Sequence, residues 1–163
     1  RFSVVGWGEA YIDLYHLVEE LNIGHAVNFY GHVSEKQKAK FLSESWAAIQ
    51  PSLIEGWGIT VIEANAAGTP VIASRVNGLK DSVVDHRTGL LVEKSNIKQF
   101  ATAMQVMISD TDMRKQLSYN AVHWAQNFDW DKSADTFYRT LGRTIEGETG
   151  IRPVVGEVFA AER

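Results

Sequence analysis

The sequence predicts an α/β fold in which helices cover both faces of a parallel sheet. Short apolar runs near residues 2–5, 27–30, 46–50, 70–73 and 89–92 are predicted strands. The segments between and after them repeat apolar residues at helical spacing. Strands that alternate with helices are typical of a parallel sheet buried on both faces. The 163 residues suffice for one sizeable core, and we expect a single domain.

The predicted helices follow the strands in a regular order. One lies between the first two strands, one opens at Ser34, and a long helical region follows the last strand. The apolar positions that define them are Ala10, Leu14, Leu17, Val18 and Leu21, then Ala39 and Leu42, then Ile97, Phe100, Ala101, Met104, Met107 and Ile108, and finally Met113, Leu117, Ala121, Trp124 and Phe128.

The composition argues against several classes of function. There is no cysteine, so disulfides and thiolate chemistry make no contribution. The net charge of −4 disfavours a nucleic-acid surface, and Lys36, Lys38 and Lys40 are expected on a solvated helix face. No apolar stretch approaches ~20 residues, so no membrane-spanning segment is predicted. The five histidines lack the spacing of a metal cluster, and we expect no metal site.

The most informative stretch is residues 51–64, which follows the predicted strand 46–50. Apolar helical spacing runs through this stretch until Gly68-Thr69-Pro70 ends it. The first N–H groups of such a helix are unpaired and point out of the carboxyl end of the strand, where a diphosphate can accept from them. The residues predicted to supply these amides are Gly56, Trp57, Gly58, Ile59 and Thr60.

Two glutamates flank this glycine-containing turn. Glu55 lies in the loop, and Glu63 lies about one turn into the helix, so their carboxylates should approach different parts of one ligand. A carboxylate that accepts from two adjacent hydroxyls makes charge-assisted hydrogen bonds, which suits the cis-diol of a ribose. We assign that role to Glu63.

The pattern of residues 55–58, with Glu63 and the segment 64–74 after it, closely resembles the signature of retaining glycosyltransferases with the two-domain GT-B fold. The group it resembles is the GT4-like enzymes, or glycosyl transferases group 1. Further similar blocks occur in the expected order, and the likeness covers residues 2–141. These blocks are residues 2–10, 27–34, 88–92 and 128–130.

The resemblance implies the carboxyl-terminal, donor-binding half of a GT-B fold, with a Rossmann-like sheet. Residues 1–145 would form this partial domain, and residues 146–163 a mobile tail. The family's first strand, at the switch point of the sheet, and its acceptor-binding domain would be missing. We therefore expect open sheet edges and self-association through them. A strand formed by residues 152–159 is the alternative that would repair an edge.

The resemblance also implies roles for individual residues. Gly6 and Gly8 would form a turn close to the nucleotide, although a plain strand-to-helix turn is equally compatible. The backbone of Val33 would hold the base, and Glu55 would be the catalytic residue that orients the sugar. Arg75 would offset the charge of the diphosphate, with a solvated loop arginine as the alternative.

Two roles are compatible with the position of Trp57 in this stretch. Its indole either stacks near the sugar or packs the loop against the core, and we favour packing because a large aromatic ring buries much area.

The activity implied is transfer of a sugar from a UDP-, GDP- or ADP-sugar to an unknown acceptor, with retained configuration and without a metal or cofactor. We expect a cytoplasmic protein, at the membrane surface if the acceptor is membrane-associated, and no transfer by this chain alone. The alternatives are the donor half of a nucleotide-sugar epimerase and a non-catalytic module of the same fold. Glu55 and Glu63 argue against the latter.

Overall fold

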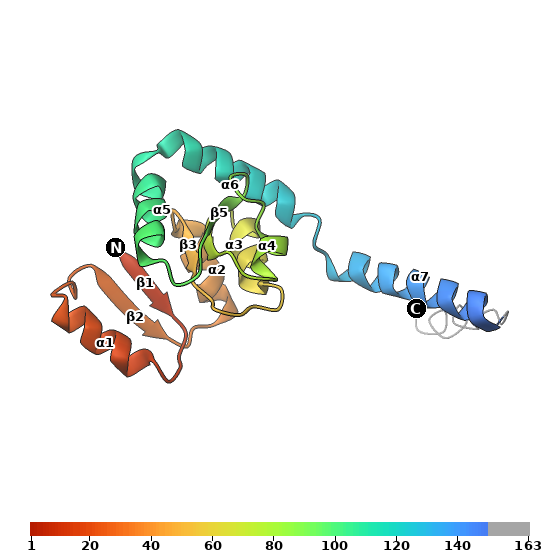
Figure 1. Cartoon of the computed structure of the whole chain (residues 1–163), viewed down its shortest axis with the longest axis horizontal. Helices are drawn as coiled ribbons and strands as arrows, with labels where there is room; N and C mark the ends of the chain where they lie inside the picture. The colour runs from red at the N-terminus through yellow and green to blue at the C-terminus, as the bar shows by residue number, and fades with distance from the viewer. Residues whose placement is uncertain (150–163) are drawn as a thin grey trace.

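The computed structural model describes residues 1–149 of the chain, and side chains as far as residue 144 (Figure 1). It confirms the α/β alternation predicted from the sequence. The strands are β1 (Phe2–Val5), β2 (Val27–Gly31), β3 (Ala48–Gln50), β4 (Val71–Ser74) and β5 (Gly89–Val92). The helices are α1 (Tyr11–Glu20), α2 (Glu35–Glu44), α3 (Ile59–Ala66), α4 (Leu79–Ser82), α5 (Ile97–Ser109), α6 (Thr111–Ala125) and α7 (Trp130–Thr149). None of the helices in this part of the chain is long and apolar enough to cross a membrane.

The five strands form two parallel sheets. β1 pairs with β2, while β4 lies between β3 and β5 in a second sheet. In this second sheet Ile49, Ile72 and Leu90 lie side by side across the three strands. Within residues 1–149, β1 and β3 do not pair with each other, and each has an edge without a partner strand, which agrees with the expected interruption of the sheet.

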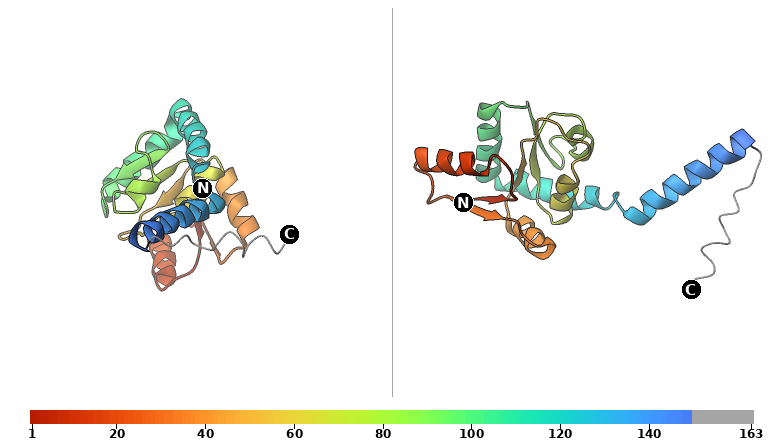
Figure 2. Two further views of the ribbon diagram at one scale, coloured as in Figure 1. Left: turned by 90° about the vertical axis from the view of Figure 1, so that its right-hand side faces the viewer. Right: turned by 90° about the horizontal axis from the view of Figure 1, so that it is seen from below.

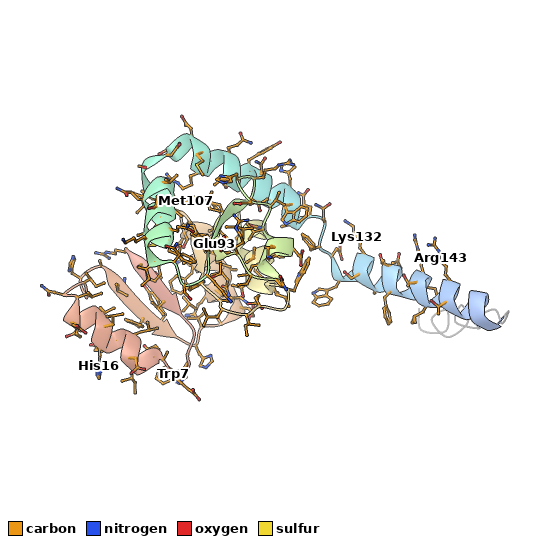
Figure 3. All side chains as sticks on the ribbon, in the orientation of Figure 1. Trp7, His16, Glu93, Met107, Lys132 and Arg143 are labelled. Atoms are coloured by element: carbon orange, nitrogen blue, oxygen red, sulfur yellow. The ribbon has the colours of Figure 1, made fainter. Side chains whose placement is uncertain are left out.

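The core is built around β4, because alternate residues of this strand face opposite sides. Val71 and Ala73 pack with residues of α3 and α4 on one side. Ile72 packs on the other side with Met107 of α5 and Leu117 of α6. Met107 is labelled in Figure 3. All four residues of β4 are buried, so the strand is covered on both faces as a parallel sheet requires.

The last helix, α7, projects away from the rest of the described residues (Figures 1 and 2). Large side chains along it are exposed, among them those of Trp130 and Phe137. α7 contains the helix predicted from residue 131 to residue 145 and continues to Thr149. The strand considered for residues 152–159 lies outside the described residues.

Candidate functional site

The loop between β3 and α3 leaves four of the five predicted amides without a partner among the described residues. Gly58 is the residue that precedes α3, and no side chain caps this end of the helix. Gly56 N–H donates to a side chain, whereas the N–H groups of residues 57–60 donate to no other atom of residues 1–149. The unpaired N–H groups and the positive end of the helix dipole together favour an anion at this position.

Two close contacts that only glycine permits hold this loop in place. Gly58 has a φ of 83°, and a Cβ there would lie 2.8 Å from Cδ2 of Leu79. Gly78 has a φ of 81°, and a Cβ there would lie 2.7 Å from the carbonyl carbon of Gly56 and still closer to the carbonyl oxygen of Glu55. Because real Cβ atoms do not approach other atoms so closely, these glycines allow residues 55–58 to pack directly against residues 78–82.

The carboxylate of Glu55 is half-buried and is oriented by its neighbours. Gly56 N–H donates to its Oε1 at 3.2 Å. Gln50 Nε2 and Ser52 Oγ lie 3.4 and 3.5 Å from its Oε2. These contacts come from the end of β3 and the loop after it, so the carboxylate is held within the loop that leads to the free amides of α3. The contacts of Gln50 and Ser52 with Glu55 were not predicted from the sequence.

Glu63 lies on α3 and forms an ion pair with Lys38 of α2. Lys38 Nζ is 2.8 Å from Oε1 of Glu63 and 2.8 Å from Oε2 of Glu35. Hydrogen bonds to Glu35 and Glu63 raise the pKa of Lys38 above its usual 10.5. The expected solvated helix face is therefore found at Lys36 and Lys40, which are exposed, whereas Lys38 is partly buried and paired. Neither partner was predicted; the three-residue spacing from Glu35 is a local signal for such a pair, whereas no sequence signal points to Glu63.

The loops after β1 and β2 form the part of the candidate site predicted to hold the base. Gly6 N–H donates to the carbonyl of Gly31 at 2.8 Å, which joins the ends of the two strands. Gly8 lies in the following turn, where its carbonyl accepts from Tyr11 N–H. The N–H of Ser34 is engaged by Gln37 in a capping box, whereas the backbone of Val33 bonds to no other described residue. Val33 therefore keeps its backbone groups free, as its predicted role requires.

Trp57 packs against the segment that precedes α7. Its ring contacts Phe128 edge to face, with 5.4 Å between centroids, and Phe128 contacts Trp124 in the same way at 5.1 Å. The indole N–H of Trp124 donates to the carbonyl of Ser82, which ties this aromatic cluster to α4. The contact with Phe128 favours the packing role of Trp57 over stacking on a sugar.

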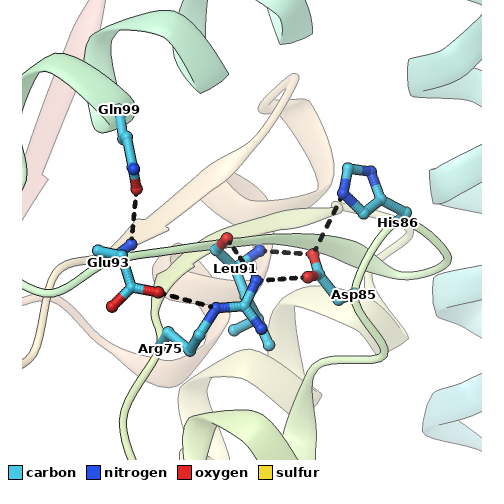
Figure 4. Close-up of polar contacts among 6 residues, drawn as sticks. All are labelled: Arg75, Asp85, His86, Leu91, Glu93 and Gln99. Atoms are coloured by element: carbon cyan, nitrogen blue, oxygen red, sulfur yellow. Dashed lines mark hydrogen bonds and ion pairs between the residues drawn. The ribbon is translucent and has the colours of Figure 1, made fainter.

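Arg75, predicted to face the diphosphate, is engaged by two carboxylates (Figure 4). Its guanidinium lies 2.6 Å from Asp85 and 3.3 Å from Glu93, and it donates to the carbonyl of Leu91. The Leu91 N–H donates to Asp85, so both backbone groups of Leu91 on the outer edge of β5 are satisfied by side chains. A diphosphate contact would require these ion pairs to break, and we leave Arg75 out of the site.

The comparison with protein families gives a match over most of the chain. The family model described as "Glycosyl transferases group 1" matches residues 1–124. An uncharacterized glycosyltransferase of Methanocaldococcus jannaschii is 32% identical over 132 residues, which are 81% of this chain and 37% of that protein. A D-inositol 3-phosphate glycosyltransferase of Streptomyces bingchenggensis is 31% identical over 143 residues, 88% of this chain and 31% of that protein. The chain thus spans about a third of the length of these relatives.

Solved structures share the fold. Sucrose-phosphate synthase from Thermosynechococcus elongatus matches with a TM-score of 0.78 and 31% identity, over 87% of this chain and 38% of that one. The Anabaena protein HepE, solved in complex with UDP, matches with a TM-score of 0.78 and 23% identity, over 85% of this chain and 40% of that one. The second match bears on the fold alone, and both confirm the fold class predicted from the sequence.

We expect Gly78→Ala to displace the loop of residues 55–58 and to lower the free energy of unfolding by about 1–3 kcal/mol, because the new methyl group overlaps Gly56 and the backbone conformation disfavours a side chain. Urea denaturation measures the change. Gly8→Ala is the control, since a Cβ there meets nothing within 4 Å. Equal stability of the two variants would show that Gly78 does not constrain the loop.

Asp85→Asn should lower the free energy of unfolding by about 1 kcal/mol near neutral pH. Burial alone would raise the pKa of Asp85, but hydrogen bonds from Leu91 N–H and Arg75 outweigh it and hold the pKa below its usual 3.8. Ionised Asp85 therefore stabilises the fold above that value, and the contribution disappears as the pH falls through the lowered pKa.

Urea denaturation at about pH 7 and about pH 2.5 measures this difference for Asp85→Asn and for Asp81→Asn. Asp81 is an exposed aspartate with no ion-pair partner among the described residues. A difference between wild type and Asp85→Asn that persisted at the lower pH would contradict the assignment.

Proposed function

The chain belongs to the glycosyl transferases group 1 family, and from this premise we propose that it is the donor-binding half of a retaining glycosyltransferase that uses a nucleoside diphosphate sugar. The observation that carries the proposal is the uncapped amino end of α3, where the free amides of residues 57–60 adjoin the oriented carboxylate of Glu55. The fold match to HepE in complex with UDP supports a uracil nucleotide as the first ligand to test.

Each part of the site has a role in this proposal. The leaving diphosphate gains negative charge in the transition state, and the amides of residues 58–60 stabilise it as fixed dipoles that need no reorganisation. Glu55 accepts from hydroxyls of the sugar and thereby orients the anomeric carbon. Glu63 accepts from the ribose diol, the backbone of Val33 holds the base, and the turn at Gly6 and Gly8 lines the nucleotide.

We assign the acceptor site to a part of the protein outside the described residues, because the relatives are about three times as long as the stretch that this chain matches. Proximity of donor and acceptor contributes about 7–11 kcal/mol to such reactions, so transfer by this chain alone is expected to be negligible. A membrane-associated acceptor fits the proposal as well as a soluble one does, since either would be bound by that other part. Measurable transfer by the isolated chain would contradict this division of roles.

Calorimetric titration with UDP, GDP and ADP tests the donor site. We expect one of the three to bind, and Glu63→Gln to weaken it by about 10- to 100-fold, the loss that follows from weakening hydrogen bonds to a charged group. Glu44→Gln is the control, because Glu44 is an exposed carboxylate of α2 whose nearest cation is Lys40 at 3.9 Å. A chain that is folded by circular dichroism and binds none of the three would instead support a non-catalytic module.

We further propose that the free edge of β1 mediates self-association. The N–H groups of Phe2 and Gly6 point toward β2, so by alternation the N–H of Ser3 points to the free edge. Sedimentation velocity over a range of concentrations should show dimers of the wild-type chain and fewer of Ser3→Pro, which removes that donor without breaking the pairing with β2. A wild-type chain that stays monomeric at about 100 μM would contradict the proposal.

A further inference from the structure

We propose that Lys38 is a positioning residue, whose ammonium group holds the Glu63 carboxylate in the orientation that accepts the ribose diol. The inference rests on the nucleotide-sugar site proposed above and adds a residue to it. Lys38 belongs to α2 and Glu63 to α3, and their contact at 2.8 Å joins two helices that are 25 residues apart in the sequence.

The geometry of the pair leaves part of the carboxylate available to a ligand. Lys38 Nζ contacts Oε1 of Glu63, whereas Oε2 of Glu63 accepts no hydrogen bond from any described residue. A carboxylate oxygen has two lone pairs, so Oε1 also retains a free one. Lys38 therefore fixes the direction of the carboxylate without occupying all of its acceptor sites.

The burial of this pair distinguishes it from an ordinary surface ion pair. The side chains of Lys38 and Glu63 are 29% and 33% exposed, and Lys38 is held on its other side by Glu35. The neighbouring pair on α2, Lys40 and Glu44, is 71% and 64% exposed with a separation of 3.9 Å. Exposed pairs of that kind are screened by solvent and order their side chains little. Lys38, by contrast, is placed to restrict the rotamers of Glu63 before a ligand arrives, which lowers the entropic cost of binding.

Lys38 also lies between the residues proposed to bind the base and the residue proposed to bind the ribose. α2 begins at Glu35, two residues after Val33, and the capping box of Ser34 and Gln37 fixes its first turn. Lys38 follows one residue after this box, so the ion pair links the loop proposed to hold the base to the carboxylate proposed to hold the ribose. The spacing between base contact and ribose contact is thus set through Lys38.

The experiment compares UDP with 2′,3′-dideoxy-UDP, which lacks the diol, in calorimetric titrations of the whole chain. The wild-type chain should bind UDP at least about tenfold more tightly than the dideoxy nucleotide. Lys38→Met should reduce this ratio to below about threefold while leaving the affinity for the dideoxy nucleotide unchanged, because only the diol contact depends on the orientation of Glu63. Lys38→Arg, which keeps the charge, should restore part of the ratio.

The controls separate positioning from stability. Lys40→Met removes a lysine from the same helix and should keep the wild-type ratio. Partial unfolding of any variant lowers both affinities by the same factor and cancels in the ratio. The positioning role is overturned if Glu63→Gln abolishes the preference for UDP over the dideoxy nucleotide but Lys38→Met and Lys38→Gln retain it. The proposed donor site would stand in that case. If the chain binds GDP or ADP in place of UDP, the same comparison is made with that nucleotide and its dideoxy analogue. A wild-type chain that binds none of the three nucleotides overturns the proposed function and the positioning role together.

Discussion

The candidate site depends on a contact between two backbones. A Cβ at Gly78 would overlap the backbone of Glu55 and Gly56, so this approach requires a glycine at residue 78. Gly58 lies beside the side chain of Leu79 in a left-handed conformation that favours glycine. Because both segments follow neighbouring strands, β3 and β4, this contact fixes the loop relative to the sheet. The position of this loop determines the direction of α3. The direction of α3 in turn determines where the free amides and Glu63 lie.

Two cations on the elements around this contact are engaged by carboxylates. Arg75 is neutralised by Asp85 and Glu93 at the outer edge of β5, and Lys38 is neutralised by Glu35 and Glu63. The amino end of α3 is therefore the feature of the described residues best suited to a negative group. An arrangement of this kind fixes the geometry of the anion more strictly than a flexible lysine would, because helix amides cannot change direction.

Much of the fold could be predicted from the sequence, since periodicity and glycine placement are local signals. All five strands and the helix after residue 58 were predicted, although β3 begins at Ala48 and not at Trp46. The positions of Glu55 and Glu63 relative to the helix could also be predicted, because Glu55 precedes the helix and Glu63 lies about one turn inside it. The contacts of Lys38 with Glu63 and of Arg75 with Asp85 could not, because they span 25 and 10 residues and no periodic pattern connects such positions. Gly78 was equally hidden, since its role depends on what a Cβ would meet in space.

The two ends of the second sheet differ in a way that affects the site. Side chains of Arg75 and Asp85 occupy the backbone groups of Leu91, so the β5 end is closed, whereas β3 has a free edge at the other end. All the strands of each sheet run parallel, and an added parallel strand at β1 or β3 would end among the same loops that carry Gly6 and Glu55. A strand that completed the sheet would then also add residues to the ligand site. The same segment would thus both stabilise the fold and contribute to ligand binding.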